Sequence, residues 1–325
     1  MERKPIAKRT LRLITLTALM GLPSILSGQN KQQVPPQGIM KQSFNMPRKG
    51  PCPLPVLPVL PAYSDSDFYA RKEVPHGEVE QVTYKTADGK EKRMHVYLPP
   101  DYKTNVSRRY PVLYLNHGGG DDDSAWTRED KHQGGYANLI LDNLIAEGKA
   151  RPMILVMPNT RGIAVAAPPV PGQDDACSKE YITRIIPFID SLYRTRASRE
   201  SRAIAGLSMG GFVVLHTGLP HLDVFSELYI YSSGHISPET LKQFEKNFEP
   251  ILSDPFINDR LRVPLYMAAG ETDIALYNGM KDLAVFDRYG IRNFWVLSDG
   301  GHEWPNWRRY LYQTAQIMFP ECETK

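Results

Sequence analysis

Cysteine is scarce in this sequence: its 325 residues include only Cys52, Cys177 and Cys322. None of the three stands beside a histidine in the spacing of a thiol nucleophile or a metal site, which argues against cysteine catalysis and cysteine-ligated metals. In an exported chain, two of them can pair in a disulfide and leave the third as a free thiol. The sequence does not decide which two pair, and a structural role is expected for all three.

Long hydrophobic runs are also missing, apart from one short run near the start. Five basic side chains precede the mostly apolar segment 13–22, and mainly small residues fill 23–28. This pattern predicts a secretory signal peptide at 1–28, too short for a stable membrane span. Gln29 stands where a lipoprotein carries its lipidated cysteine. We therefore expect a periplasmic or secreted protein without a membrane anchor; the alternative is a retained N-terminal helix.

The chain has no strong surplus of either charge. Its formal net charge is +3, but residues 1–28 hold five basic side chains and one acid, so residues 29–325 carry 34 basic and 35 acidic side chains. No basic stripe remains to suggest a nucleic-acid partner. A hydrophobic content of 42% with 23% charged residues is that of an ordinary globular protein. The length suits one large domain with extra segments, or two small domains.

Proline is abundant before the main body of the chain, with eight prolines in residues 31–62. This spacing excludes helix and central strand and favours extended polyproline segments. We expect residues 29–70 to form a linker or a surface strap, and residues 71–325 to form the catalytic domain. The apolar side chains between Leu54 and Leu60 favour a strap that packs on the domain.

Strand and helix patterns alternate from residue 71 onward, which predicts an α/β fold built of parallel βαβ units. Two alternating segments flank Asp88-Gly89 and predict an antiparallel hairpin at the start. The expected strands are 79–84, 92–98, 111–116, 153–157, 203–205, 228–231, 264–270 and 293–297. The expected helices are 136–145, 182–193, 211–216, 238–248, 280–289 and one at the C-terminus. We expect a mainly parallel central sheet with helices on both faces.

The sequence Gly206-Leu207-Ser208-Met209-Gly210 lies between a predicted strand and a predicted helix. Strand, tight turn and helix form the context of a nucleophile elbow, in which Ser208 projects above the sheet. Gly206 and Gly210 leave room for the turn and for close strand–helix packing. The amide of Met209 opens the helix and can point at a developing oxyanion. Because this pentapeptide also arises by chance, the interpretation depends on the rest of the chain.

A second glycine-rich segment, His117 to Gly120, follows the predicted strand 111–116. The fold takes its second oxyanion donor from this loop, and we expect the Gly119 amide, with Gly118 or Gly120 as alternatives. A plain glycine-rich turn is the other interpretation. His117 is expected to brace the loop through hydrogen bonds. The residues Asp121 to Asp123 lack the spacing of a calcium loop and are expected to be an acidic surface run.

Ser208, Asp273 and His302 follow one another in the chain order of an α/β-hydrolase triad, each just past a predicted strand. His302 would accept the Ser208 proton, and the acid would orient the imidazole and stabilise its charged form. Glu271 is the rival acid, whereas Asp299 is expected to shape the turn before His302. The weaker candidates for the base are His216, His221 and His235.

From about residue 75 to 320 the chain resembles the esterase-D-like branch of the α/β-hydrolases, and within it the family 1 carbohydrate esterases. The segments that carry the resemblance are 96–100, 111–118, 152–159, 186–189, 203–211, 270–273, 301–304 and Trp307-Arg308. The resemblance implies the α/β-hydrolase fold, favours Asp273 over Glu271, and implies neither a metal nor an organic cofactor. It does not extend to the proline-rich segment or to residues 160–178, and no carbohydrate-binding module is apparent.

The expected function is hydrolysis of feruloyl or acetyl esters on plant cell-wall polysaccharide fragments. Alternatives on the same fold are a siderophore esterase, an S-formylglutathione hydrolase and an acyltransferase; one of another class is a non-catalytic glycan-binding protein. A feruloyl group is favoured because Trp126 and Trp304 lie near the predicted mouth, where an aromatic acid can stack on them. The small apolar residues of 160–178 would complete that pocket. The sequence does not indicate the oligomeric state.

Overall fold

The computed structural model describes residues 40–42, 52–162 and 174–322. The chain divides into a short unit, residues 1–35, and a large unit, residues 36–325, and the fold is that of the large unit. The predicted signal peptide at 1–28 and most of the loop 160–178 lie outside the described residues.

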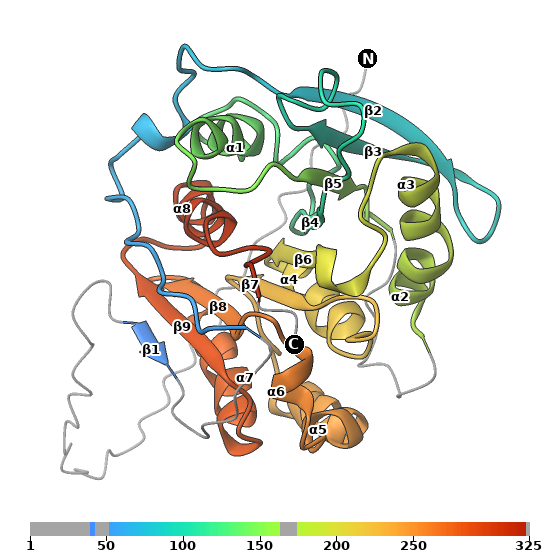
Figure 1. Cartoon of the computed structure of the whole chain (residues 1–325). Helices are drawn as coiled ribbons and strands as arrows, with labels where there is room; N and C mark the ends of the chain where they lie inside the picture. Colours follow the sequence, from blue (N-terminus) through green and yellow to red (C-terminus); the bar gives the residue numbers. More distant parts are fainter. Residues whose placement is uncertain (1–39, 43–51, 163–173, 323–325) are drawn as a thin grey trace, which may run out of the picture. The chain divides into compact units, whose positions relative to one another are not determined.

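A nine-stranded mixed sheet runs through the large unit in the order β1-β9-β8-β7-β6-β4-β5-β3-β2 (Figure 1). Its strands are β1 Met40–Gln42, β2 Glu78–Lys85, β3 Glu91–Leu98, β4 Val112–Asn116, β5 Ile154–Pro158, β6 Arg202–Leu207, β7 Glu227–Tyr231, β8 Leu265–Gly270 and β9 Asn293–Ser298. The six strands from β5 to β9 in this order are parallel. The predicted hairpin, β2–β3, joins antiparallel at one edge, and β1 pairs antiparallel with β9 at the other.

Helices follow the predicted strands in alternation, as a fold of βαβ units requires. They are α1 Ala137–Ala146, α2 Ala176–Glu180, α3 Ile186–Leu192, α4 Met209–Val213, α5 Pro238–Leu252, α6 Ile257–Arg260, α7 Leu276–Arg288 and α8 Trp304–Ala315. The predicted helix 182–193 begins earlier and is interrupted by a π-helical turn, Tyr181–Ile185, just before Pro187. Proline cannot donate to the preceding turn, so it starts a new helical segment there. None of the helices in the described ranges is long and apolar enough to cross a membrane.

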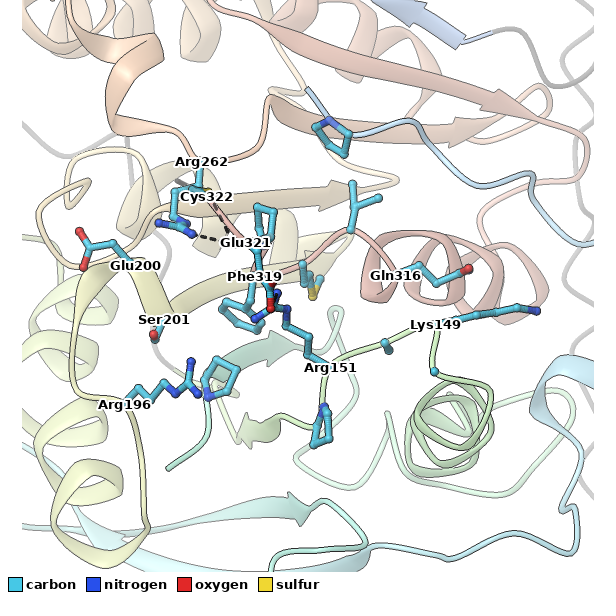
Figure 2. Close-up of a pocket in the computed structure, with 18 of the residues that line it drawn as sticks. Lys149, Arg151, Arg196, Glu200, Ser201, Arg262, Gln316, Phe319, Glu321 and Cys322 are labelled. Carbon is cyan, nitrogen blue, oxygen red and sulfur yellow. Dashed lines mark hydrogen bonds and ion pairs between the residues drawn. The ribbon is translucent and has the colours of Figure 1, made fainter. Parts of the chain in front are cut away.

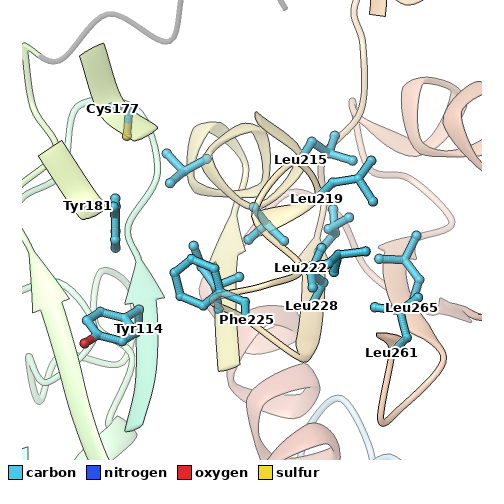
Figure 3. Packing of buried hydrophobic residues seen from close by; sticks show 14 of the residues in the cluster. Tyr114, Cys177, Tyr181, Leu215, Leu219, Leu222, Phe225, Leu228, Leu261 and Leu265 are labelled. Atoms are coloured by element: carbon cyan, nitrogen blue, oxygen red, sulfur yellow. The ribbon is translucent and has the colours of Figure 1, made fainter. Parts of the chain in front are cut away.

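Alternate side chains of the central strands enter two hydrophobic cores, one on each face of the sheet. On β4, Val112 and Tyr114 enter one core, and Leu113 and Leu115 enter the other. Side chains of α4, α5 and α7 fill the first core, and those of α1 and α8 fill the second. Figure 3 shows part of the first core, where Phe225 and its leucine neighbours lie against the sheet. Helices therefore cover both faces, as predicted.

The described part of the proline-rich segment, from Cys52 onward, lies against the domain. The Leu57 side chain is buried in the second core. Arg309 of α8 donates its Nε–H to the Pro61 carbonyl at 2.8 Å, and Gln313 donates to the Pro58 carbonyl. A disulfide joins Cys52 to Cys322, which decides the pairing that the sequence left open. Cys177 is a free, buried thiol. These contacts make residues 52–61 a strap over α8.

Breaking the disulfide is expected to lower the free energy of unfolding by about 2–5 kcal/mol, because the link closes a long loop and restricts the unfolded chain. The two cysteines are 270 residues apart in sequence. Urea denaturation of the oxidised protein and of Cys322→Ser would measure the loss. Reductant should lower the wild-type midpoint and leave that of Cys322→Ser unchanged. Equal midpoints for oxidised wild type and variant would contradict a stabilising link.

Candidate active site

Ser208, Asp273 and His302 meet where β6, β8 and β9 end at the carboxyl edge of the parallel strands. His302 Nε2 lies 2.9 Å from Ser208 Oγ, and His302 Nδ1 lies 2.8 Å from Asp273 Oδ1. An ionised carboxylate only accepts hydrogen bonds, so Nδ1 carries the proton and Nε2 is free to accept one from Ser208. The rival carboxylates lie elsewhere: Glu271 is exposed, and Asp299 pairs with Arg309 at 2.7 Å.

The turn that carries Ser208 is strained and tightly packed. Ser208 has φ 52° and ψ −119°, a conformation that L-residues rarely adopt and that functional sites retain. A Cβ on Gly206 would lie 2.3 Å from the carbonyl of Gly210. A Cβ on Gly210 would lie 2.7 Å from the carbonyl oxygens of Asn116 and His117. Both glycines of the motif are therefore required for β4, β6 and α4 to pack this closely.

The Asp273 carboxylate is ready to hold a charged imidazole. Burial by itself would raise the pKa of Asp273, but the hydrogen bonds from His302 and from the Ala275 amide, together with the nearby Ser232 hydroxyl, outweigh it and hold that pKa below its ordinary value. The amide bond from Ala275 to Oδ1 is 2.7 Å long. Asp273 therefore stays ionised at neutral pH, where an imidazolium on His302 would need its charge.

The loops that carry Asp273 and His302 are tied to each other. Thr272 donates both its amide (3.1 Å) and its hydroxyl (2.9 Å) to the Gly300 carbonyl. Gly300 adopts φ 83°, which allows the chain to turn back toward the sheet before His302. Asn306 of α8 donates to the Gly301 carbonyl at 2.9 Å. The histidine loop is thus fixed from two sides.

The glycine-rich loop after β4 lies directly beside the elbow. A Cβ on Gly118 would lie 3.4 Å from Ser208 Cβ, and one on Gly119 would lie 3.2 Å from Met209 Cγ. This places the loop where the predicted oxyanion donors, the Met209 and Gly119 amides, belong. His117 braces the loop as expected: its Nδ1 lies 2.8 Å from the Gly118 carbonyl, and its Nε2 accepts from the Thr160 amide at 3.1 Å. Burial lowers the pKa of His117, which favours this neutral form.

The prediction of an acidic surface run at 121–123 is wrong for Asp123. Its side chain is fully buried, with Oδ2 2.9 Å from His95 Nδ1 and Oδ1 3.1 Å from Arg93. Both partners stand on β3, so the turn after the glycine-rich loop brings this carboxylate back against the sheet. The group stabilises the base of the loop.

The prediction that Trp126 and Trp304 stack on a substrate is also wrong. Trp126 is 1% exposed and donates its Nε1–H to the Asn116 carbonyl at 2.9 Å. Trp304 is 5% exposed, and its ring packs edge-on against that of Trp126 at a centroid distance of 5.3 Å. Both indoles belong to the core under α8, and neither offers a free face.

The sequence argument missed the apolar side chains that are exposed beside the triad. Tyr277 is 74% exposed and Ile274 is 80% exposed at the start of α7, directly after Asp273. Ile236 on the loop after β7 and Met209 on the elbow are exposed as well. Lys281 of α7 donates to the Ile236 carbonyl at 3.1 Å, so the loop after β7 and α7 are neighbours. The apolar residues that follow Asp273 closely in the sequence could have predicted this exposed apolar surface.

A separate cavity of about 1060 Å³ lies at the opposite end of the parallel strands (Figure 2). Residues that precede strands β4, β5, β6 and β8 line it together with the segment 316–322. Several cationic side chains, Arg151 and Arg262 among them, face it in Figure 2. No triad residue contributes to its wall, so it is distinct from the candidate active site.

Comparisons with known proteins show that the chain belongs to an esterase family. A family model described as "Putative esterase" matches residues 86–317. An endo-1,4-beta-xylanase/feruloyl esterase of Xylanibacter ruminicola is 34% identical over 276 residues, which are 80% of this chain and 34% of that protein. Endo-1,4-beta-xylanase Y of Acetivibrio thermocellus is 27% identical over 267 residues, 75% of this chain and 23% of that protein. The chain thus spans about a third or less of these two relatives.

Solved structures of esterases also resemble this chain. A ferulic acid esterase is 27% identical, with a TM-score of 0.62 over 75% of this chain and 97% of that one. The feruloyl esterase module from Clostridium thermocellum, complexed with sinapinate, is 24% identical, with a TM-score of 0.65 over 80% of this chain and 94% of that one. The second likeness shows the fold alone.

Proposed function

Because the chain belongs to the esterase family whose model covers residues 86–317, we propose that it is an exported serine esterase of acylated plant cell-wall polysaccharides. The α/β-hydrolase fold expected from the sequence is confirmed by the mixed sheet and by the solved structures that share it. The observation that carries the proposal is the continuous hydrogen-bonded line Ser208–His302–Asp273, with distances of 2.9 and 2.8 Å.

The geometry supports hydrolysis in two steps. His302 Nε2 accepts the Ser208 proton while Oγ attacks the ester carbonyl, and the Met209 and Gly119 amides face the developing oxyanion. The protonated imidazole, held by Asp273, then gives its proton to the sugar oxygen as the ester C–O bond breaks, which releases the sugar hydroxyl and leaves an acyl-enzyme. Water repeats the sequence and releases the acid. No metal or cofactor is required by these residues.

Two features support the substrate class and the export. A related protein carries both xylanase and feruloyl esterase in its name, and a matching structure is a ferulic acid esterase. The basic and apolar pattern of residues 1–28 is that of a signal peptide, and disulfides such as Cys52–Cys322 persist in oxidising compartments.

The proposal is tested with a substrate panel on the mature protein recovered from the periplasm or the culture fluid. Methyl ferulate, feruloylated arabinoxylan oligosaccharides, acetylated xylan and an aryl acetate are compared, with an added alcohol acceptor to detect acyl transfer. We expect hydrolysis of the ferulate esters and stoichiometric labelling of Ser208 by an active-site phosphonate. Failure of the phosphonate to react would indicate a non-catalytic scaffold, and a dominant transfer product would indicate an acyltransferase.

Tyr277→Ala is expected to lower kcat/KM for methyl ferulate by about 2–10-fold and to leave the rate on an aryl acetate unchanged. The exposed Tyr277 ring stands one helical turn beyond Asp273, and a ring contact of this kind stabilises by about 0.5–1.5 kcal/mol. Phe256→Ala is the matched control, since Phe256 is 60% exposed at the N-cap of α6, which precedes β8, whereas Asp273 follows β8. Equal losses of kcat/KM on both substrates would show that Tyr277 does not discriminate between acyl groups.

A further inference from the structure

Asp273 has a second carboxylate oxygen that His302 does not use. Oδ1 accepts from both His302 and the Ala275 amide. Oδ2 is buried and has no hydrogen-bond partner among the described residues. A buried carboxylate oxygen without a donor is costly, so a nearby hydroxyl is expected to serve it.

Ser232 provides a hydroxyl in the right place. It follows β7, the strand next to β8, and its amide donates to the Ala268 carbonyl of β8 at 2.7 Å (Figure 1). The side chain is fully buried, and the residue has φ 50°, a conformation that a serine adopts only under constraint. The hydroxyl lies near enough to Asp273 to be one of the causes that keep the pKa of that carboxyl low.

The orientation of the Ser232 hydroxyl is set by Trp307 of α8. The indole Nε1–H donates to Ser232 Oγ at 2.9 Å, and an indole N–H can only donate. Oγ therefore acts as the acceptor toward Trp307, and the hydroxyl proton is left to point elsewhere. The Trp307 ring also packs edge-on against the His302 ring, with a centroid distance of 5.1 Å. Trp307 thus contacts both Ser232 and the His302 ring.

We propose that Ser232 is a positioning residue for the triad: Trp307 fixes its Oγ, and its hydroxyl proton is donated to Asp273 Oδ2, which holds Oδ1 toward His302. The inference rests on the proposed function, since the alignment matters to the reaction only if Ser208 and His302 perform it. Ser232, which follows β7, would donate to Asp273, and Trp307 of α8 donates to Ser232. Neither position carries a catalytic signature in the sequence.

Loss of this donor has a defined consequence for pH dependence. A hydrogen bond to the charged form of a carboxyl lowers its proton affinity, so removing it raises that affinity. His302 donates to this carboxylate, so a more basic carboxylate also stabilises the charged imidazole, and we expect the pair to keep its proton up to a higher pH. A catalytic base must be unprotonated, so the acid limb of the activity profile should move to higher pH.

Tyr310 of α8 is a titratable group close enough to Asp273 for their charges to interact. Tyr310 of α8 bonds to Ser298 at 2.7 Å, and burial raises its pKa far above the working range. The Tyr310 hydroxyl therefore stays protonated throughout the acid limb and does not contribute to a shift there. Arg309, on the same helix, pairs with Asp299.

The test compares Ser232→Ala with Ser233→Ala. Ser233 is the adjacent buried serine, and its Oγ has no hydrogen-bond partner among the described residues. We expect Ser232→Ala to lower kcat on an aryl acetate by roughly 10–100-fold with KM nearly unchanged, and to move the acid limb up by about half to one pH unit. Ser233→Ala should resemble wild type. Trp307→Phe, which keeps a ring but removes the N–H, should move the limb in the same direction by less.

A spectroscopic readout separates this inference from the proposed function. The proton between His302 Nδ1 and Asp273 is expected to give a downfield proton NMR signal, and Ser232→Ala should shift it while Ser233→Ala does not. An unshifted signal together with an unmoved acid limb would overturn the positioning role, even where kcat falls through packing. Equal shifts in both serine variants would overturn it too. If wild-type hydrolysis does not depend on Ser208, the proposed function fails. The NMR signal still tests whether Ser232 donates a hydrogen bond to Asp273.

Discussion

Ser208→Ala is expected to lower kcat for every ester that the protein hydrolyses by at least about 10⁴-fold. The substitution removes the hydroxyl oxygen that lies 2.9 Å from His302 Nε2, and with it the acyl-enzyme route. Oxyanion donors and substrate contacts would remain and would support a small residual rate. Initial rates on an aryl acetate and on methyl ferulate, with active-site titration of the wild type, measure the loss.

Two comparisons make the Ser208 result specific. Ser191→Ala, on the exposed face of α3, should keep the full rate, which excludes a general effect of serine removal. Thermal unfolding of Ser208→Ala should match or exceed that of wild type, because the strained turn no longer has to hold a hydroxyl. A variant that folds normally and keeps more than a tenth of the wild-type rate would disprove the role of Ser208 as nucleophile.

The sequence predicted the positions of the triad because they follow from chain order and sheet geometry. Parallel strands all end at one edge, so residues just past β6, β8 and β9 meet there whatever their separation in sequence. The short apolar runs that mark these strands are buried on both faces and are easy to recognise. The elbow glycines, in turn, are required by close backbone packing, which a sequence motif records directly.

Side-chain direction was harder to predict, because it depends on contacts between distant segments. Trp126 follows the glycine-rich loop and Trp304 begins α8, yet both side chains pack into the core. Asp123 looks like a surface acid until His95 on β3 is brought next to it by the fold. No feature of the sequence indicated the positioning role proposed for Ser232 and Trp307, since a serine after a strand and a tryptophan in a helix are common in any fold.

Trp126→Ala is expected to cost about 3–5 kcal/mol of unfolding free energy and to leave the substrate preference of the folded protein unchanged. The indole fills the core among Tyr231 and Trp304, and its removal leaves a cavity that the sheet and α8 cannot easily close. It also leaves the buried Asn116 carbonyl without its side-chain donor, which adds a desolvation cost. Urea denaturation at neutral pH measures the loss.

Trp126→Phe separates the two contributions, because it keeps a ring and removes the N–H. We expect it to cost roughly 1–3 kcal/mol, below the cost of Trp126→Ala. For both variants the ratio of kcat/KM on methyl ferulate to that on an aryl acetate, measured well below the unfolding transition, should equal the wild-type ratio. A selective loss on methyl ferulate with wild-type stability would show that this indole contacts the acyl group. It would contradict the assignment of Trp126 to the core that supports the glycine-rich loop.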